Sequence, residues 1–305
     1  MLGGGSFTTQ NKVLPGAYIN FVSAATTRSL MSDRGIAAVP VILDWGPEKE
    51  VFEITAEKFQ NHCFDLFGHN YEDEEMRPFR ELFRNLTKGI IYRLNGGIHA
   101  ANDFAVARYS GRRGSSMTTV ISQNVNDSTM YDVKTLFASK EVDRQTVASV
   151  ADLQDTDYCT FKRETALRET AGIPFTGGTN GDGVTGADYS AFLEVMEAYS
   201  FNTLCCPSTD DHVKALFAAY TRRLRDEAGI KFQTVMYRYP QADYEGVISV
   251  ENSIRGSAIA GSAVAGVTAL GDDAAAPEVK DGFPYVIRLK LKEGDSVGNY
   301  VAPKV

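Results

Sequence analysis

The sequence has few residues of the kinds that form crosslinks or catalytic centres. Its 305 residues include four cysteines, four histidines and one tryptophan. Cys205 and Cys206 are neighbours inside an apolar run, and adjacent side chains of a strand point to opposite faces. We therefore interpret the cysteines as core residues. The chain is long enough to bury a sizeable core without disulfides, and we expect a reducing, cytoplasmic environment during folding.

Excess positive charge and long apolar runs are also missing. The formal net charge is −8, which argues against a general nucleic-acid or membrane surface, because phosphate binding needs a basic face. The longest weakly apolar stretch, residues 258–270, is rich in alanine and glycine and too short to span a bilayer. Residues 1–6 have neither the basic start nor the apolar middle of a signal peptide. We predict a soluble, non-exported protein with no membrane insertion.

Catalytic and metal-binding motifs are missing as well. The four histidines are His62, His69, His99 and His212. They form no HExxH pattern, and the sequence shows neither paired cysteines nor a pattern of carboxylates that could orient histidines on a metal ion. The sequence contains no G-x-S-x-G elbow and no P-loop lysine. We therefore predict no catalytic residue, no cofactor and no metal site, and a protein that is not an enzyme.

The clearest pattern present lies in residues 173–239. A glycine-rich turn at 176–186 precedes a helix whose apolar residues recur with helical spacing; they are Tyr189, Phe192, Leu193, Met196 and Tyr199. Thr185 and Asp188 match an N-terminal capping pattern. Residues 201–206 and 230–239 read as buried strands on either side of a second helix, which begins after Asp210. Strands that alternate with helices predict a mostly parallel sheet.

Residues 35–94 repeat this organisation, with strands at 35–44, 51–54 and 89–94 and helices between the last two. Between the two α/β parts, short alternating stretches at 104–109, 117–125, 130–137, 141–147 and 158–161 predict an antiparallel module. The predicted fold is therefore α/β, with a mixed, mostly parallel sheet, helices, an inserted antiparallel β module and extended terminal arms. The core comprises 33–101 and 173–251, and the module comprises 102–172.

Both ends of the chain lack helical periodicity. We predict an extended N-terminal arm at 1–32, which contains one strand-forming stretch, the arm strand: Tyr18, Ile19, Asn20, Phe21 and Val22. A free strand has unpaired backbone groups, which favours addition to another sheet in the same or a neighbouring subunit. A disordered terminus is the alternative for residues 1–12. Residues 252–305 read as a flexible linker, 257–276, and a terminal strand, 283–291, whose partner the sequence does not indicate.

The glycine-rich turn has two interpretations. Gly181, Gly183 and Gly186 match G-x-G-x-x-G literally and open a helix, as in dinucleotide sites. However, residues 173–176 make a poor central strand, and the next strand ends at Cys206 and Pro207 instead of an acidic residue that would hold a ribose. A tight turn followed by a helix cap explains the same residues.

Several segments resemble the tail sheath proteins of contractile phage tails and phage-like particles (tailocins), especially the prophage branch of Gram-positive bacteria. The matching segments, in order, are 1–22, Val39-Pro40, 43–47 (LDWGP), 92–95 (YRLN), 176–181 with 188–189, and 243–250 (DYEGVISV). The match covers about residues 1–251, and an ordered series of this kind is far more specific than one glycine motif.

The resemblance implies a virion structural protein, in a tail assembled in the host cytoplasm. Subunits of this family stack as hexameric rings around an inner tail tube, and their contraction drives the tube through a bacterial envelope. It implies as partners the subunit itself, the tube protein, and baseplate and tail terminator proteins, with no nucleic acid. It also implies that the arm strand pairs with a neighbouring subunit and that the β module faces outward.

The resemblance ends near Asn252, where family members continue with further strands and helices. A truncated or frame-shifted reading frame and a divergent ending are both compatible with the sequence. The alternative function is a cytoplasmic nucleotide-dependent enzyme that uses Gly181, Gly183 and Gly186.

Overall fold

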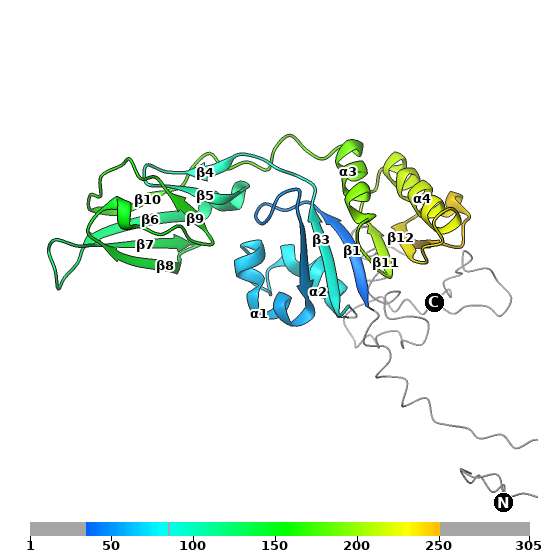
Figure 1. The fold of residues 1–305 in the computed structure, drawn as a ribbon, viewed down its shortest axis with the longest axis horizontal. Coiled ribbons are helices and arrows are strands. Elements are labelled where there is room, and N and C mark those ends of the chain that lie inside the picture. The colour runs from blue at the N-terminus through cyan, green and yellow to red at the C-terminus, as the bar shows by residue number, and fades with distance from the viewer. Residues whose placement is uncertain (1–34, 85, 251–305) are drawn as a thin grey trace, which may run out of the picture.

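The computed structural model describes residues 35–84 and 86–250. The predicted arm strand, the linker at 257–276 and the strand at 283–291 lie outside this part of the chain. The described residues form an α/β body with a β module at one end of it (Figure 1).

A six-stranded sheet forms the centre of the α/β body, in the order β13-β12-β11-β1-β3-β2. All neighbouring pairs are parallel except β2 with β3. The strands are β1 (Ile36–Val41), β2 (Val51–Thr55), β3 (Lys88–Arg93), β11 (Thr203–Cys206), β12 (Gln233–Tyr237) and β13 (Val247–Val250). This confirms the predicted α/β class with a mixed, mostly parallel sheet.

Helices cover both faces of this sheet because its strands carry apolar residues in both directions. The helices are α1 (Ala56–Phe67), α2 (Arg77–Phe83), α3 (Gly186–Met196) and α4 (Asp211–Asp226). Cys205 packs in one core cluster with Phe59 and Phe79 from α1 and α2. Cys206 packs in the other, with Phe192 and Phe217 from α3 and α4. The adjacent cysteines therefore fill opposite faces of β11.

The helices α1, α3 and α4 begin at capping residues. Thr55 accepts a hydrogen bond from the backbone N–H of Lys58 at 3.2 Å, and Asp210 accepts one from the N–H of His212 at 2.8 Å. A reciprocal capping box joins Thr185 and Asp188 at the start of α3. Each cap satisfies a backbone donor that the first helical turn leaves free.

The β module consists of two antiparallel sheets, ordered β10-β6-β7-β8 and β4-β5-β9. Its strands are β4 (His99–Ala101), β5 (Ala105–Ser110), β6 (Met117–Gln123), β7 (Tyr131–Phe137), β8 (Lys140–Val147), β9 (Cys159–Phe161) and β10 (Thr170–Pro174). Short 3-10 helices occur at Glu74–Met76, Arg112–Ser116, Val150–Asp152 and Pro240–Ala242. β4 and β10, at the margins of the predicted module, pair within it.

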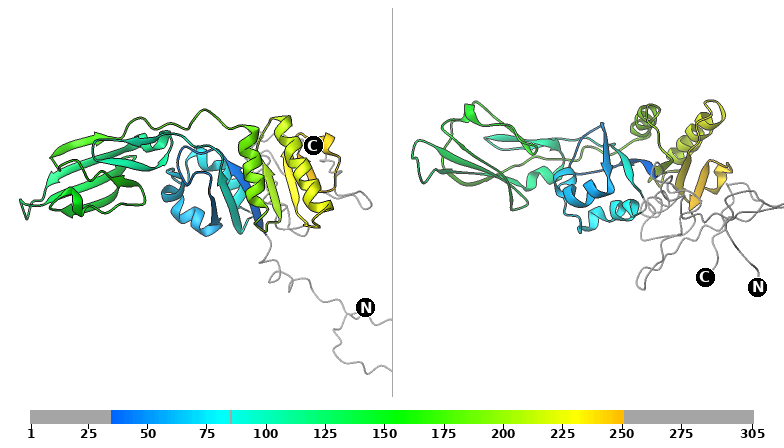
Figure 2. Two further views of the ribbon diagram at one scale, coloured as in Figure 1. Left: turned by 45° about the horizontal axis from the view of Figure 1, so that its top comes forward. Right: turned by 60° about the horizontal axis from the view of Figure 1, so that its bottom comes forward.

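The module extends the molecule along its long axis and stays at the same end in all three views (Figure 2). The chain leaves the sheet after β3 and returns through the glycine-rich turn to α3 (Figure 1). These two connecting segments touch, because Ile98 and Thr179 form an isolated antiparallel bridge. The module is therefore attached through two paired segments, and both of them join the α/β body at the carboxyl end of its parallel strands.

Two residues expected inside elements lie outside them. Tyr199 follows the end of α3 at Met196 and is 37% exposed, so it does not belong to the buried stripe of that helix. Ile230 precedes β12 and is 46% exposed, because the chain reverses at Gly229, whose φ is +68°. Both predictions were wrong at the element boundary, where a turn and not apolar periodicity sets the end.

Candidate functional site

The glycine-rich turn brings two backbone segments into close contact. A Cβ at Gly97 would lie 1.9 Å from the carbonyl oxygen of Thr179, and one at Gly181 would lie 2.1 Å from that of Gly96. Gly181 also has a φ of +76°, which other residues rarely adopt. These glycines are therefore required where the chain leaves and re-enters the sheet.

The arrangement differs from that of a dinucleotide site. In such a site the glycines follow a strand of the parallel sheet, whereas here the preceding strand is β10, which pairs with β6 of the module. Gly183 and Gly186 have open space around them, and Thr185 and Asp188 form the helix cap. The geometry supports the turn-and-cap interpretation of Gly181, Gly183 and Gly186.

A buried arginine lies beneath the paired connecting segments, at the end of β3. Arg93 is fully buried and donates hydrogen bonds to the carbonyl oxygens of Gly46 at 2.8 Å and Ser110 at 3.1 Å. Glu48 lies 3.9 Å from its guanidinium and accepts a hydrogen bond from the Ser110 N–H at 2.6 Å. Burial lowers the pKa of Arg93, against the opposing effect of Glu48 and Asp44. We call this group, with Asn95, the junction cluster.

Asn95 links three segments at the same place. Its side chain accepts from the N–H of Leu43 at 2.9 Å and donates to the Leu43 carbonyl at 2.8 Å and to the Asn180 carbonyl at 3.3 Å. The ends of β1 and β3 and the glycine-rich turn are therefore held by one amide. Because the two bonds to Leu43 are buried, their loss would leave polar backbone groups without partners.

Aromatic packing completes the attachment of the module. Trp45 is fully buried, and its ring lies 5.3 Å from that of Tyr109 and 4.9 Å from that of Phe137, both module residues. The Tyr158 hydroxyl donates to Asp65 of α1 at 2.5 Å. The structure thus places Trp45, from the LDWGP segment, in the core of the module.

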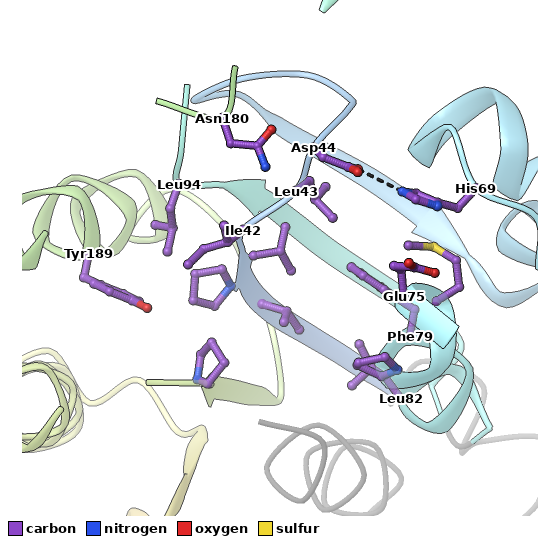
Figure 3. A pocket seen from close by; sticks show the side chains of 16 residues that line it. Ile42, Leu43, Asp44, His69, Glu75, Phe79, Leu82, Leu94, Asn180 and Tyr189 are labelled. Carbon is purple, nitrogen blue, oxygen red and sulfur yellow. Dashed lines mark hydrogen bonds and ion pairs between the residues drawn. The ribbon is translucent and has the colours of Figure 1, made fainter. Parts of the chain in front are cut away.

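A groove of about 460 Å³ opens at the carboxyl end of the sheet. Its walls come from β1, α2, the first turn of α3 and the residue after β11 (Figure 3). The lining residues are Val39, Pro40, Val41, Ile42, Leu43, Asp44, His69, Glu75, Met76, Pro78, Phe79, Leu82, Leu94, Asn180, Tyr189 and Pro207. They are mostly apolar.

The groove forms because β1 and β11 separate. They pair only at Ala37 with Thr203 and at Ala38 with Leu204, although β1 continues along β3 as far as Val41. The carbonyl of Ile36 accepts a hydrogen bond from the N–H of Asn202, just before β11. Because the backbone groups of every second strand residue point to the same neighbouring strand, those of Pro40 also point toward β11. Since proline has no N–H, the ladder cannot continue there.

One titratable pair lies in the groove. His69 is buried, and its Nε2 lies 2.9 Å from Asp44, while Asp73 lies 3.8 Å from its Nδ1. Burial alone would raise the pKa of Asp44, but its hydrogen bond and charge interaction with His69 lower it overall. The lining residues include no serine, threonine, cysteine or lysine.

The remaining candidates are dispersed. His62 is exposed and lies 3.3 Å from Asp65, while His99 contacts the Ala107 carbonyl at 2.8 Å and His212 lies in the first turn of α4. Within 35–84 and 86–250, no group of three or more histidine, cysteine or acidic side chains is arranged to hold a metal ion. No helix in those ranges has the length and apolarity of a membrane span.

The cysteines are buried and unpaired. Burial raises the pKa of Cys63 to about 12 and that of Cys206 to about 12, which keeps both as unreactive thiols at neutral pH.

Sequence reasoning found the glycine-rich turn but missed the junction cluster and the groove. The signal for the first was Arg93, a charged residue inside the apolar run 89–94. The signal for the second was Pro40 inside a central strand. The arm strand lies outside the described residues, so its role stays a prediction.

Three sequence models of phage tail sheath domains match successive parts of the chain. They are the Gp18 domain III N-terminal region at 34–94, the beta-sandwich domain at 95–180 and the central domain at 182–280. The third match continues past Asn252, so the expectation that the resemblance ends there was wrong. The chain is also 34% identical over 278 residues to two Bacillus subtilis (strain 168) proteins, the phage-like element PBSX protein XkdK and the uncharacterized protein YqbK. Each alignment covers 83% of this chain and 59% of the relative.

Solved structures agree. The sheath tail protein of Desulfitobacterium hafniense superposes with a TM-score of 0.73 at 39% identity, over 83% of this chain and 62% of that one. A sheath tail protein of Listeria innocua gives 0.70 at 31% identity, over 80% and 60%. The chain thus spans about 60% of the length of these relatives. Three consecutive domain matches together with the shared fold show that the chain belongs to the phage tail sheath protein family.

Proposed function

We propose that this chain is the structural subunit of a contractile tail sheath. In this role copies polymerise into a helical tube of stacked hexameric rings around an inner tail tube, and contraction drives that tube through a bacterial envelope. The observation that carries the proposal is the run of three sheath-domain matches across residues 34–280, in chain order. The proposed partners are the subunit itself, the tube protein, and baseplate and tail terminator proteins, with assembly in the host cytoplasm.

The geometry of the described residues supports a mechanical role. The β module is attached by a buried arginine, a buried tryptophan and two paired backbone segments, so it will move as one body with the sheet. The acid–histidine pair of the groove has no serine, threonine, cysteine or lysine among the other lining residues. A non-enzymatic subunit needs stiffness and surfaces, and contraction then draws on lattice contacts that are more favourable in the contracted state.

The arm strand is the proposed connection between subunits. Tyr18, Ile19, Asn20, Phe21 and Val22 have the composition of a strand, and strand addition supplies main-chain hydrogen bonds without a preformed pocket. A head-to-tail connection of this kind produces a ring where the rotation between subunits closes and a helical assembly where it does not.

The test is assembly of the chain in the presence of purified tube protein, followed by negative-stain microscopy and sedimentation. Striated tubes support the proposal. Replacing Ile19 and Phe21 with proline removes two backbone donors from the arm strand, and it should abolish tubes while Asn20→Ala leaves them intact. Monomers under every condition, with tube protein and baseplate material present, would refute the proposal.

A further inference from the structure

The terminal strand predicted at 283–291, here called the terminal segment, has one wholly apolar face. Side chains alternate along a strand, so its odd-numbered positions share a face. Those positions are Phe283, Tyr285, Ile287, Leu289 and Leu291, whereas the even-numbered positions include Arg288 and Lys290. An apolar face gains free energy when it is covered, and a basic face favours acidic surroundings. The terminal segment therefore fits a surface that is apolar inside and acidic at its rim.

The groove at the carboxyl end of the six-stranded sheet offers an apolar surface of suitable size. Its volume of about 460 Å³ and its mostly apolar lining are typical of a binding groove. Ile42 stands on its rim and is 61% exposed. Phe79 and Leu82 of α2 form one wall, and Tyr189 lies across β1 from them (Figure 3). Among the described strands, none pairs with β1 on the β11 side beyond Ala38, so this part of β1 is open to contact with an added segment.

The charge of the groove complements that of the terminal segment. Its lining contains the carboxylates Asp44 and Glu75 and, among the described residues, no lysine or arginine. Asp44 is already bonded to His69. Glu75 is exposed and has no ion pair within residues 35–84 and 86–250, and Arg77, two positions further on, pairs with Glu74 instead. A basic side chain that enters the groove thus meets an available carboxylate.

The terminal segment can reach the groove from the last described residue. Val250 ends β13, which runs parallel to β12, β11 and β1, so Val250 lies at the same end of the sheet as the groove. Three strand spacings separate β13 from β1, a distance of roughly 15 Å. A flexible linker as long as residues 251–282 has an average end-to-end distance of about 30 Å. The connection is therefore long enough without extension.

The arm strand fits the groove less well. Its residues, Tyr18, Ile19, Asn20, Phe21 and Val22, carry no charge. The residue from which the N-terminal part of the chain departs, Gly35, precedes β1 and lies at the amino end of the sheet. The six residues of β1 place it about 20 Å from the groove end. Charge and position both favour the terminal segment as the occupant.

We infer that the terminal segment binds in the groove of its own chain, with its odd-numbered, apolar side chains against α2 and β1 and its basic side chains beside Glu75. The contact lies within one chain, so it is separate from the arm strand and does not depend on sheath assembly. It covers the apolar lining and closes the groove to any other segment while it is bound.

The first test is disulfide crosslinking within one chain. Complete chains that carry Ile42→Cys together with Ile287→Cys or Leu289→Cys are oxidised gently with copper-phenanthroline at low protein concentration. The native cysteines are buried, so the background is low. Mass spectrometry of unreduced tryptic peptides identifies the bond. Val286→Cys, on the opposite face of the segment, is the matched partner, because it changes no charge.

An intrachain bond at Ile287→Cys or Leu289→Cys, with much less at Val286→Cys, supports the inference. The absence of such a bond overturns it. So does equal crosslinking when Val125→Cys, which is 96% exposed in the β6–β7 turn of the module, replaces Ile42→Cys.

Two further arms identify any other occupant. Stronger crosslinking of Ile42→Cys to Ile19→Cys would place the arm strand in the groove and overturn the inference. In a mixture of isotope-labelled and unlabelled chains, bonds that join a labelled to an unlabelled peptide would show that a second copy supplies the segment, which also overturns it. Because these measurements use dilute chains, their outcome is independent of whether the chain forms tubes with the tail tube protein.

Thiol labelling of Ile42→Cys gives a second readout. With an effective concentration of about 1 mM for the tethered segment and a dissociation constant of about 0.1 mM, the groove is open for about a tenth of the time. The label should therefore react roughly tenfold more slowly than in a chain with Ile287→Asp and Leu289→Asp. Equal rates in the two chains would overturn the inference.

Charge reversal tests the position of Glu75. Glu75→Lys, and Arg288→Glu together with Lys290→Glu, should each reduce the protection of Ile42→Cys about two- to fivefold, as for the loss of exposed ion pairs. Each rate is divided by that of the same variant carrying the two aspartates, which removes direct effects of charge on the thiol. Combining the reversals should restore protection, and effects that simply add would contradict the pairing. Glu194→Lys, at an exposed position near the end of α3, is the control and should change nothing. Circular dichroism checks the fold of each variant.

Discussion

The junction cluster should be essential for the stability of the described body, and Arg93→Met tests this directly. Methionine keeps most of the aliphatic length but removes the donors to the carbonyls of Gly46 and Ser110. Leaving buried acceptors unpaired costs about 1–3 kcal/mol each, and removing one partner of a buried ion pair costs about 3–5 kcal/mol. Glu48 is 25% exposed and can regain water, so the lower end applies. We expect a loss of about 3 kcal/mol in unfolding free energy.

Thermal and urea unfolding, followed by circular dichroism, measure this loss. For a cooperative unit of this size, 3 kcal/mol corresponds to a fall in Tm of roughly 10 °C. Arg108→Met is the matched control, because Arg108 lies on β5 near Ser110 but is half exposed and pairs with the exposed Asp157; it should change stability by less than about 0.5 kcal/mol.

A second variant separates charge from packing. In the Arg93→Met background, Glu48→Gln removes the uncompensated carboxylate and keeps an oxygen for the Ser110 N–H, so it should recover part of the lost stability. If Arg93→Met stays within about 1 kcal/mol of the unmodified chain, the junction cluster is not what the reasoning claims. If Glu48→Gln recovers nothing, the cost comes from the unpaired carbonyls and the altered packing, and not from the carboxylate of Glu48.

Three further predictions concern the glycine-rich turn, its helix cap and the thiols. Gly97→Ala should destabilise by more than about 2 kcal/mol, because its Cβ would clash with the Thr179 carbonyl, whereas Gly186→Ala, which meets open space, should be near neutral in the same urea titration. Asp188→Ala should cost about 0.5–2 kcal/mol at pH 7 through loss of the capping box. The backbone N–H of Thr185 lowers the pKa of Asp188 below its usual 3.8, so this stabilisation is complete above that pH and lost as pH falls through the lower folded pKa; a difference between variant and parent that persists unchanged at pH 2 would contradict it. A thiol reagent at pH 8 should label Cys63 and Cys206 only after unfolding, and rapid labelling of the native chain would show that burial has been misjudged.

The element sequence of the described part was largely predictable because it depends on local patterns. Helix starts at Thr55, Thr185 and Asp210 follow from side chains that can accept a backbone hydrogen bond within the next turn. The alternating stretches between 104 and 161 predicted five antiparallel strands, and β5 to β9 occupy them. Helix and strand ends were predicted less well, as Tyr199 and Ile230 show, because turn geometry decides them.

The sequence by itself determined most of the apolar residues that are buried, which segments alternate and which family the chain resembles, since each of these depends on the order of side chains along a few turns or strands. Only the tertiary structure decided how the glycines of the turn are used, which carbonyls Arg93 reaches and where the groove opens. Gly97 and Gly181 meet backbone more than 80 residues away along the chain, and Arg93 bonds to residues 47 and 17 positions distant. Contacts over such separations depend on the packing of the sheet against the module, and no local pattern of residues encodes that packing.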